Sequence, residues 1–350
     1  MKRRTLLAGS LALPVAAPFF VRAQQWPTHP IRMIVPYAPG ATGDIGGRLY
    51  GEELGKTLGQ TVVIDNKTGA GGTIAMADLA RGAPDGYTLG VIAQGLLVYN
   101  MGLYKTPGYD PFKDLTVLSI NFSVANVLIV HPSNPAKTVA DVVEQARAKN
   151  GEFTFASGGV GTSHHMSGVL LEMRSGVKMT HVPYRATPAG IQAVVNGEVQ
   201  MGMFNTPTVV SLIRAGKLKA LAVTSAKRID QFPELPTMIE AGFKDFVVDT
   251  WLGFGAPAGL PPPLVTRLNG EFNRITNLPE MRKKFDEQGE VVANKYAESA
   301  LERQSLETLT AGVVLASFRG EADTQVTAPP AAAMEALSQG SMAASRALVH

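Results

Sequence analysis

Short apolar runs alternate with amphipathic segments along most of this chain. The apolar runs predict β-strands at 31–35, 61–65, 88–92, 153–156, 199–204 and 218–224, and two more strands between 115 and 130. Apolar residues spaced three or four positions apart predict helices at 44–58, 74–81, 138–150, 163–175, 188–197, 206–216, 264–275 and 279–288. This alternation predicts an α/β fold with central β-sheets flanked by helices.

The two ends of the chain differ from this pattern. Residues 1–23 begin with three basic residues, continue with an apolar stretch and end in Val21-Arg22-Ala23, which predicts an export signal cleaved after about Ala23. The pair Arg3-Arg4 leaves both the general and the twin-arginine export routes open. From about 294 onward the sequence is rich in Ala, Ser and Thr, and we expect marginal helix or disorder there.

Charge and cysteine content bear on which partners the protein binds and on how its fold is stabilised. The 350 residues carry a formal charge of +3, but residues 1–23 contribute four cations and no anion, so the remaining chain has a formal charge of −1. That balance gives no indication of a nucleic-acid or membrane surface. An exported chain without cysteine has no disulfides and must be stabilised by packing. The chain after the signal is longer than a domain with a single hydrophobic core usually is, which predicts two domains.

Three glycine-rich loops connect predicted strands to predicted helices, at 36–44, 66–72 and 157–165. In open α/β sheets such loops gather at the carboxyl ends of the strands, where ligands bind. The first N–H groups of a helix lack internal partners and lie at its positive end, so a carboxylate or phosphate is favoured there. Charged side chains are sparse in these loops, which indicates recognition through main-chain donors. A purely structural role for the glycines and hydroxyls stays open at this point.

Other chemistries fit these residues less well. His164 and His165 are helix neighbours about 100° apart, not the three or four residues apart that a chelating pair needs, so no metal or cofactor is expected. We expect His165 to fix the loop or donate to a ligand, and His164 to face solvent. The glycines match neither a dinucleotide nor a phosphate-loop motif. A secreted hydrolase using Ser163 or Ser157 stays a minority hypothesis, because no nucleophile elbow is present.

Six motifs in order resemble the Bug family, the periplasmic receptors of tripartite tricarboxylate transporters. They are Pro36-Tyr37 with Gly40 and Asp44, Gly69–Gly72, Pro84–Thr88, Gly159-x-Gly161-Thr162 with His165, Val182–Arg185, and Trp251-x-Gly253 with Ala256-Pro257. The resemblance covers the chain to about residue 292. It implies a periplasmic-binding-protein (Venus-flytrap) fold, with domain 1 at 24–125 and 249–293, domain 2 at 126–248, and crossing hinge strands between them.

The resemblance also implies a non-enzymatic receptor that holds a small carboxylate between two domains and delivers it to a membrane permease. We expect a periplasmic monomer; a sensory receptor for a membrane kinase is the other alternative. The implied ligand-binding residues are Tyr37, Ala38, Gly40, Thr42, Gly43, Asp44, Gly71, Ser157, Gly158, Thr162, Ser163, His165, Tyr184, Asn205 and Trp251. For Trp251, packing at the hinge is as strong an expectation as ligand contact.

The sequence departs from the family pattern in the first loop, in the turn after Tyr184 and in the tail. The second glycine of the first loop is Ala41, and Ala186 and Thr187 replace glycines after Tyr184-Arg185. Val199-Gln200 replaces the usual Val-Asp. These changes leave the identity of the carboxylate open.

Overall fold

The computed structural model describes residues 26–295. The signal peptide predicted at 1–23 and almost all of the tail predicted at 294–350 lie outside the described residues. Within the described part, no helix is long and apolar enough to cross a membrane.

One half of the molecule is built on a sheet in the order β2-β1-β3-β9-β4, with β10 also paired to β4. β1, β2 and β3 are parallel, whereas β9 is antiparallel to both of its neighbours. The strands are β1 (Ile31–Val35), β2 (Val62–Asn66), β3 (Thr88–Ala93), β4 (Leu115–Val130), β9 (Asp249–Pro257) and β10 (Glu290–Lys295). The helices are α1 (Thr42–Leu58), η1 (Ala70–Gly72), α2 (Thr73–Ala80), the π-helix η2 (Gly95–Tyr99), α3 (Asn100–Leu103), α8 (Pro262–Thr276) and α9 (Pro279–Gln288).

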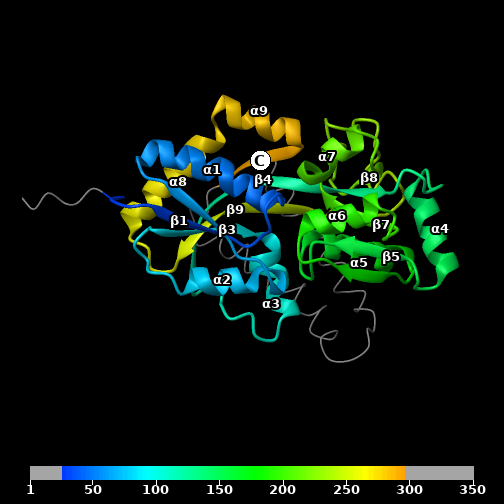
Figure 1. Ribbon diagram of the computed structural model, residues 1–350, viewed down its shortest axis with the longest axis horizontal. Helices are drawn as coiled ribbons and strands as arrows, with labels where there is room; N and C mark the ends of the chain where they lie inside the picture. The colour runs from blue at the N-terminus through cyan, green and yellow to red at the C-terminus, as the bar shows by residue number, and fades with distance from the viewer. Residues whose placement is uncertain (1–25, 296–350) are drawn as a thin grey trace, which may run out of the picture.

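The other half is formed by the chain between β4 and β9, green in Figure 1. Its strands β6, β5 and β7 are parallel, and β7 and β8 each pair antiparallel with the end of β4. These strands are β5 (Thr154–Ser157), β6 (Thr180–Pro183), β7 (Met201–Asn205) and β8 (Lys219–Val223). The helices around them are α4 (Val139–Lys149), α5 (Ser163–Ser175), α6 (Thr187–Val195) and α7 (Thr206–Arg214).

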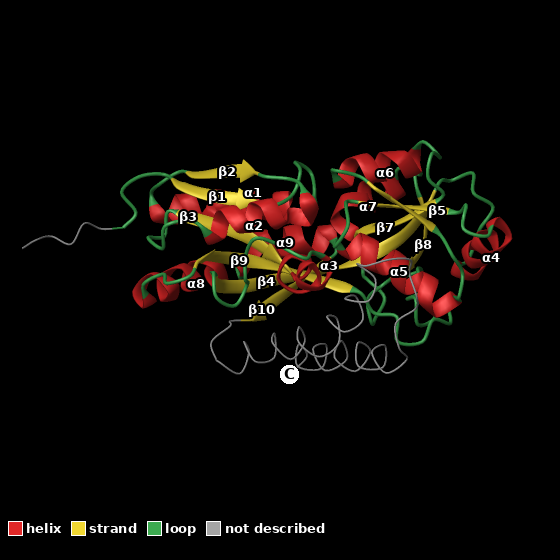
Figure 2. Cartoon of the chain, turned by 90° about the horizontal axis from the view of Figure 1, so that it is seen from below, coloured by secondary structure: helices red, strands yellow, loops and turns green. Residues whose placement is uncertain are grey.

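β4 belongs to both halves. Residues 115–125 pair with β9, whereas residues 126–130 pair with β7 and β8 (Figures 1 and 2). The prediction of two separate strands between 115 and 130 was therefore wrong. Positions 126 and 249, the predicted domain boundaries, coincide with this change of partners and with the start of β9. The division into domains at these positions remains a prediction.

Each half has a hydrophobic core between its sheet and the helices that cover it. In the first half a stack of aromatic rings fills the space between the sheet and its helices, with Phe254 and Phe272 parallel at 4.3 Å between centroids and Tyr50 at 4.7 Å from Phe254. In the second half, successive residues of β4 face opposite cores: Val127 lies in one and Leu128 in the other. A sheet covered on both faces explains why this part of the sequence is continuously apolar.

Helix ends follow the sequence signals closely. The Thr138 side chain accepts from the Asp141 N–H, and the Asp141 carboxylate accepts from the Thr138 N–H, so α4 begins with the capping box that a Thr followed three residues later by an acidic residue indicates. α5 ends where Gly176 adopts a left-handed conformation with φ of 68°.

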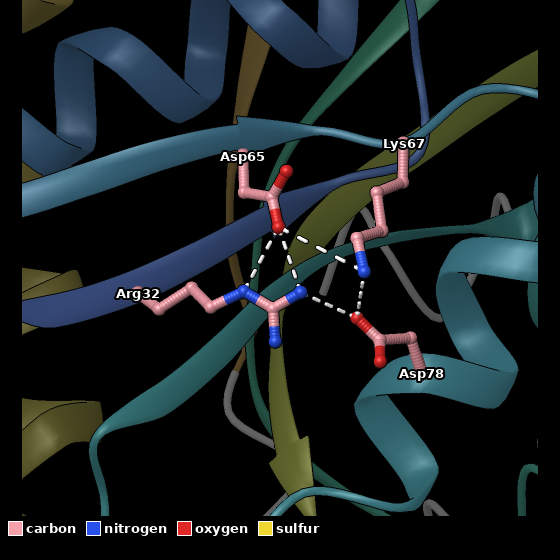
Figure 3. Close-up of polar contacts among 4 residues, drawn as sticks. All are labelled: Arg32, Asp65, Lys67 and Asp78. Atoms are coloured by element: carbon pink, nitrogen blue, oxygen red, sulfur yellow. Dashed lines mark hydrogen bonds and ion pairs between the residues drawn. The ribbon is translucent and has the colours of Figure 1, made fainter.

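A cluster of four charged side chains ties β1, β2 and α2 together near the surface (Figure 3). Arg32 donates to Asp65 at 2.7 Å and also to Asp78, and Lys67 donates to Asp78 at 2.6 Å. All four are one quarter to two fifths exposed, so solvent screens these pairs and their contribution to stability is small.

Candidate functional site

A pocket lies between the two halves, where loops from both meet. Its wall combines the first two glycine-rich loops, the end of β3, the third glycine-rich loop, the starts of α6 and α7, and β9. The lining residues are Tyr37, Ala41, Thr42, Gly43, Gly71, Ala93, Gly95, Leu96, Gly161, Thr162, Ser163, His164, Thr187, Asn205, Thr250 and Leu252. Loops 36–44 and 157–165 thus share one hollow, as the sequence predicts.

Four helices begin at this pocket. Thr42 and Thr187 are the first residues of α1 and α6, Thr162 is the N-cap of α5, and Asn205 is the N-cap of α7; all four line the wall. The positive end of each helix carries about half an elementary charge, together with N–H groups that lack helical partners. None of the lining residues is Lys, Arg, Asp or Glu. The electrostatics of the wall therefore favour an anion through main-chain dipoles.

Asp44 organises the first loop from behind the pocket wall. The carboxylate is 3% exposed and accepts from Gly40 N–H at 2.9 Å, from Asn66 Nδ2 at 2.8 Å and from Arg48 Nε at 3.0 Å. Asn66 also donates to the Tyr37 carbonyl at 2.8 Å. Burial raises the pKa of Asp44, but the hydrogen bonds from Arg48, Asn66 and Gly40 outweigh it and hold the pKa below its usual value. Asp44 stays ionised and fixes both ends of the loop.

Glycines let the two halves approach at backbone distance. A Cβ on Gly71 would lie 2.6 Å from the Val160 carbonyl oxygen, and a Cβ on Gly95 would lie 2.5 Å from the Gly161 carbonyl oxygen. Gly71 also has a φ of 60°, which disfavours any other residue. Side chains at these positions would hold the halves apart.

The third loop is fixed by its own hydroxyls. Thr162 donates to the Gly159 carbonyl at 2.7 Å and accepts from the His165 N–H, so it is the N-cap of α5. Ser157 is fully buried and shares a 2.6 Å hydrogen bond with His181 Nε2. Gly161 N–H donates to His165 Nδ1 at 3.4 Å. These contacts agree with the expectation that His165 fixes the loop.

His164 does not face solvent, and that prediction was wrong. Its ring is 4% exposed, lines the pocket and shares a hydrogen bond with Asn205 at 3.1 Å. Burial lowers the pKa of His164 to about 4, so the ring is neutral at physiological pH. Burial, and then the adjacent His181, lower the pKa of His165 to about 3. The side chain that the sequence assigned to the surface is part of the site.

The structure brings about half of the predicted ligand-binding residues to the wall. Those at the pocket are Tyr37, Thr42, Gly43, Gly71, Thr162, Ser163 and Asn205. Those outside the lining are Ala38, Gly40, Asp44, Ser157, Gly158, His165, Tyr184 and Trp251. Trp251 packs against Val98, as do Tyr99, Leu103 and Met166, and this small cluster contains residues from both halves.

Sequence reasoning missed the part of the wall made by β3, η2 and β9, together with the start of α6. Ala93, Gly95 and Leu96 follow a predicted strand, and a glycine in that position was an available signal. Thr187 stands before a proline at the start of a helix, the same N-terminal signature as Thr206. Thr250 and Leu252 belong to no recognisable binding motif, and they reach the wall only because β9 passes there.

Residues 26–295 contain no group of three or more His, Cys, Asp or Glu side chains that could hold a metal ion.

Two α/β halves, crossing strands and a hollow between them define a periplasmic-binding-protein fold. The profile "Tripartite tricarboxylate transporter family receptor" matches residues 47–307, and the chain belongs to this family. Protein BugT of Bordetella pertussis is 33% identical over 276 residues, which is 79% of this chain and 84% of BugT. A second profile, phosphoenolpyruvate carboxylase, matches residues 280–350, most of which lie outside the described residues.

Solved structures agree with this assignment. A protein of R. palustris solved with adipate has a TM-score of 0.77 and 33% identity, covering 81% of this chain and 94% of that one. MatC from Rhodopseudomonas palustris, with bound malate, has a TM-score of 0.77 and 29% identity, covering 85% of this chain and all of the other. The periplasmic binding protein BugD also has a TM-score of 0.77, at 30% identity.

Proposed function

We propose that this protein is an extracytoplasmic receptor that captures a small carboxylate in the pocket between its halves and delivers it to a tripartite tricarboxylate-type membrane transporter. Closure of the halves would bury the ligand and form a surface that the permease recognises. The proposal includes a cleaved signal peptide at 1–23, a periplasmic location and action as a monomer.

The observation that carries the proposal is the convergence of four helix N-termini on a pocket without charged side chains. Such a site stabilises a carboxylate by oriented N–H groups and hydroxyls, and it places no counter-charge that would hinder release. Relatives of the same family solved with adipate and malate support a carboxylate as the ligand.

The hydrolase alternative lacks an arranged nucleophile. Ser157 has a histidine partner, but it is fully buried and does not line the pocket. Ser163 lines the pocket, but its hydroxyl donates to Asn126 Oδ1, and the adjacent His164 ring is engaged by Gly158 and Asn205. We therefore propose a receptor without catalytic activity. Ester hydrolysis that Ser163→Ala abolishes would contradict this.

Calorimetric titration of the purified protein tests the receptor function. The panel contains mono-, di- and tricarboxylates and, as matched controls, neutral diamides such as adipamide and malamide. We expect at least one carboxylate to bind and its amide to fail, because the helix termini discriminate by charge. Equal binding of acid and amide, or flat traces for the whole panel, would reject the proposal. Native mass spectrometry of freshly purified protein would identify a retained acid.

A further inference from the structure

A chain of hydrogen bonds crosses the pocket from one half of the molecule to the other. In the second half, Gly158 N–H donates to His164 Nδ1 at 3.3 Å, and His164 Nε2 lies 3.1 Å from Asn205 Oδ1. The Thr42 hydroxyl, at the start of α1 in the first half, donates to the same Asn205 oxygen at 3.3 Å. All of these side chains are at least nine-tenths buried.

The backbone fixes the direction of every bond in this chain. A backbone N–H can only donate, so Nδ1 of His164 must accept from Gly158 and the ring proton must sit on Nε2. Nε2–H therefore donates, and the atom of Asn205 facing it must be the oxygen. The amide nitrogen of Asn205 then points to Asn126 Oδ1, at 2.7 Å. The Asn205 amide is thus oriented from two sides, by Nε2–H of His164 at its oxygen and by Asn126 Oδ1 at its nitrogen.

This orientation decides what Thr42 offers to the pocket. A hydroxyl has one proton, and that of Thr42 is directed at Asn205 Oδ1. The lone pairs of Thr42 are left for the pocket that the residue lines. At this point the wall presents a hydrogen-bond acceptor, although the helix termini around it present donors. A plain carboxylate has no proton to give to such an acceptor.

We propose that His164 is a positioning residue that orients the Asn205 amide, and that Thr42 consequently selects carboxylates bearing a hydroxyl group. The carboxylate would occupy the donors of the helix termini and its hydroxyl would donate to Thr42. An ammonium group could also donate, but it would lie among four positive helix ends, which disfavour it. The inference rests on the proposed receptor function and names the subclass of its ligand.

Matched pairs of acids test the selectivity. Calorimetry would compare malate with succinate, lactate with propionate, and mandelate with phenylacetate. In at least one pair we expect the hydroxy acid to bind at least about fivefold more tightly, because the plain acid leaves a buried acceptor unpaired. His164→Leu removes the donor that requires the Asn205 oxygen on this side, so the Asn205 and Asn126 amides can turn over together and bring the Asn205 nitrogen toward Thr42. The ratio within the pair should then fall to about one, whereas a loss of folding alone would weaken both acids equally.

Thr42 provides a second test in case His164→Leu does not fold. Thr42→Val removes the acceptor and should also abolish the preference, whereas Thr42→Ser keeps the hydroxyl and should preserve it. If no hydroxy acid binds more tightly than its partner while some carboxylates of the panel bind, the selectivity is overturned and the receptor function stands. A preference that survives both His164→Leu and Thr42→Val overturns the assigned roles. If no carboxylate binds at all, the receptor function itself fails.

Discussion

Replacing Asp44 by asparagine tests whether one buried carboxylate organises the first loop of the site. The change keeps the shape but turns one oxygen into an amide nitrogen. In one orientation that nitrogen would face Gly40 N–H and in the other Asn66 Nδ2, and in both it would face Arg48 Nε; all of these are donors. At least one charge-assisted hydrogen bond is lost and a donor faces a donor. Because such bonds contribute about 1.5–3 kcal/mol each, the free energy of unfolding should fall by about 2–4 kcal/mol.

The matched control is Asp78→Asn in the charged cluster of Figure 3. Asp78 is 26% exposed, and its loss leaves the Arg32–Asp65 pair in place. The cost should stay below about 1 kcal/mol. Urea unfolding followed by circular dichroism measures both variants, and calorimetry should show weakened carboxylate binding for Asp44→Asn alone. An Asp44→Asn protein within 1 kcal/mol of the original, or a larger loss for Asp78→Asn, would refute the reasoning.

Three further predictions follow from the buried groups. As pH falls from 7 to 4, the unfolded chain protonates His164 before the folded one does, so this residue should remove about 3 kcal/mol from the free energy of unfolding. His164→Gln should reduce the loss of stability over this pH range by that amount, and the partly buried rings of His165 and His181 should account for a remaining pH dependence. Gly95→Ala should weaken ligand binding about tenfold by calorimetry, since its Cβ meets Gly161, whereas exposed Gly270→Ala should leave affinity unchanged. Tyr50→Phe should cost about 1 kcal/mol in urea unfolding, because a buried 2.8 Å hydrogen bond to Thr276 is lost.

Local signals predicted most of the fold, because they depend on neighbours in the sequence. The capping box at Thr138 and the glycine after α5 are examples. The continuity of β4 was missed, since Asn121 and Asn126 interrupt the apolar run and resemble turn residues. In the structure both are fully buried, with their amides donating to Thr276 and Ser167. These partners come from distant segments, which the local pattern does not contain.

The site was predictable where a helix N-terminus and a glycine-rich loop coincide, as at Thr42 and Ser163. It was not predictable for His164. Two adjacent histidines at the start of a helix differ only in the direction each faces, and that direction is set by contacts with Asn205 and Gly158. The side of the wall formed by Thr250 and Leu252 depends on where β9 enters the sheet, which is a property of the tertiary structure.

The position of β9 has a consequence for how the molecule assembles. This strand sits between β3 and β4, although it is made only after the whole of the other half. Gly90 pairs with Gly255, so the contacts that complete the central sheet are among the most distant in sequence. Such contacts form slowly. A nascent chain in which β9 has not yet been synthesised therefore exposes two unpaired strand edges, and chaperones that guard such edges would protect it until the last fifth of the described chain is made.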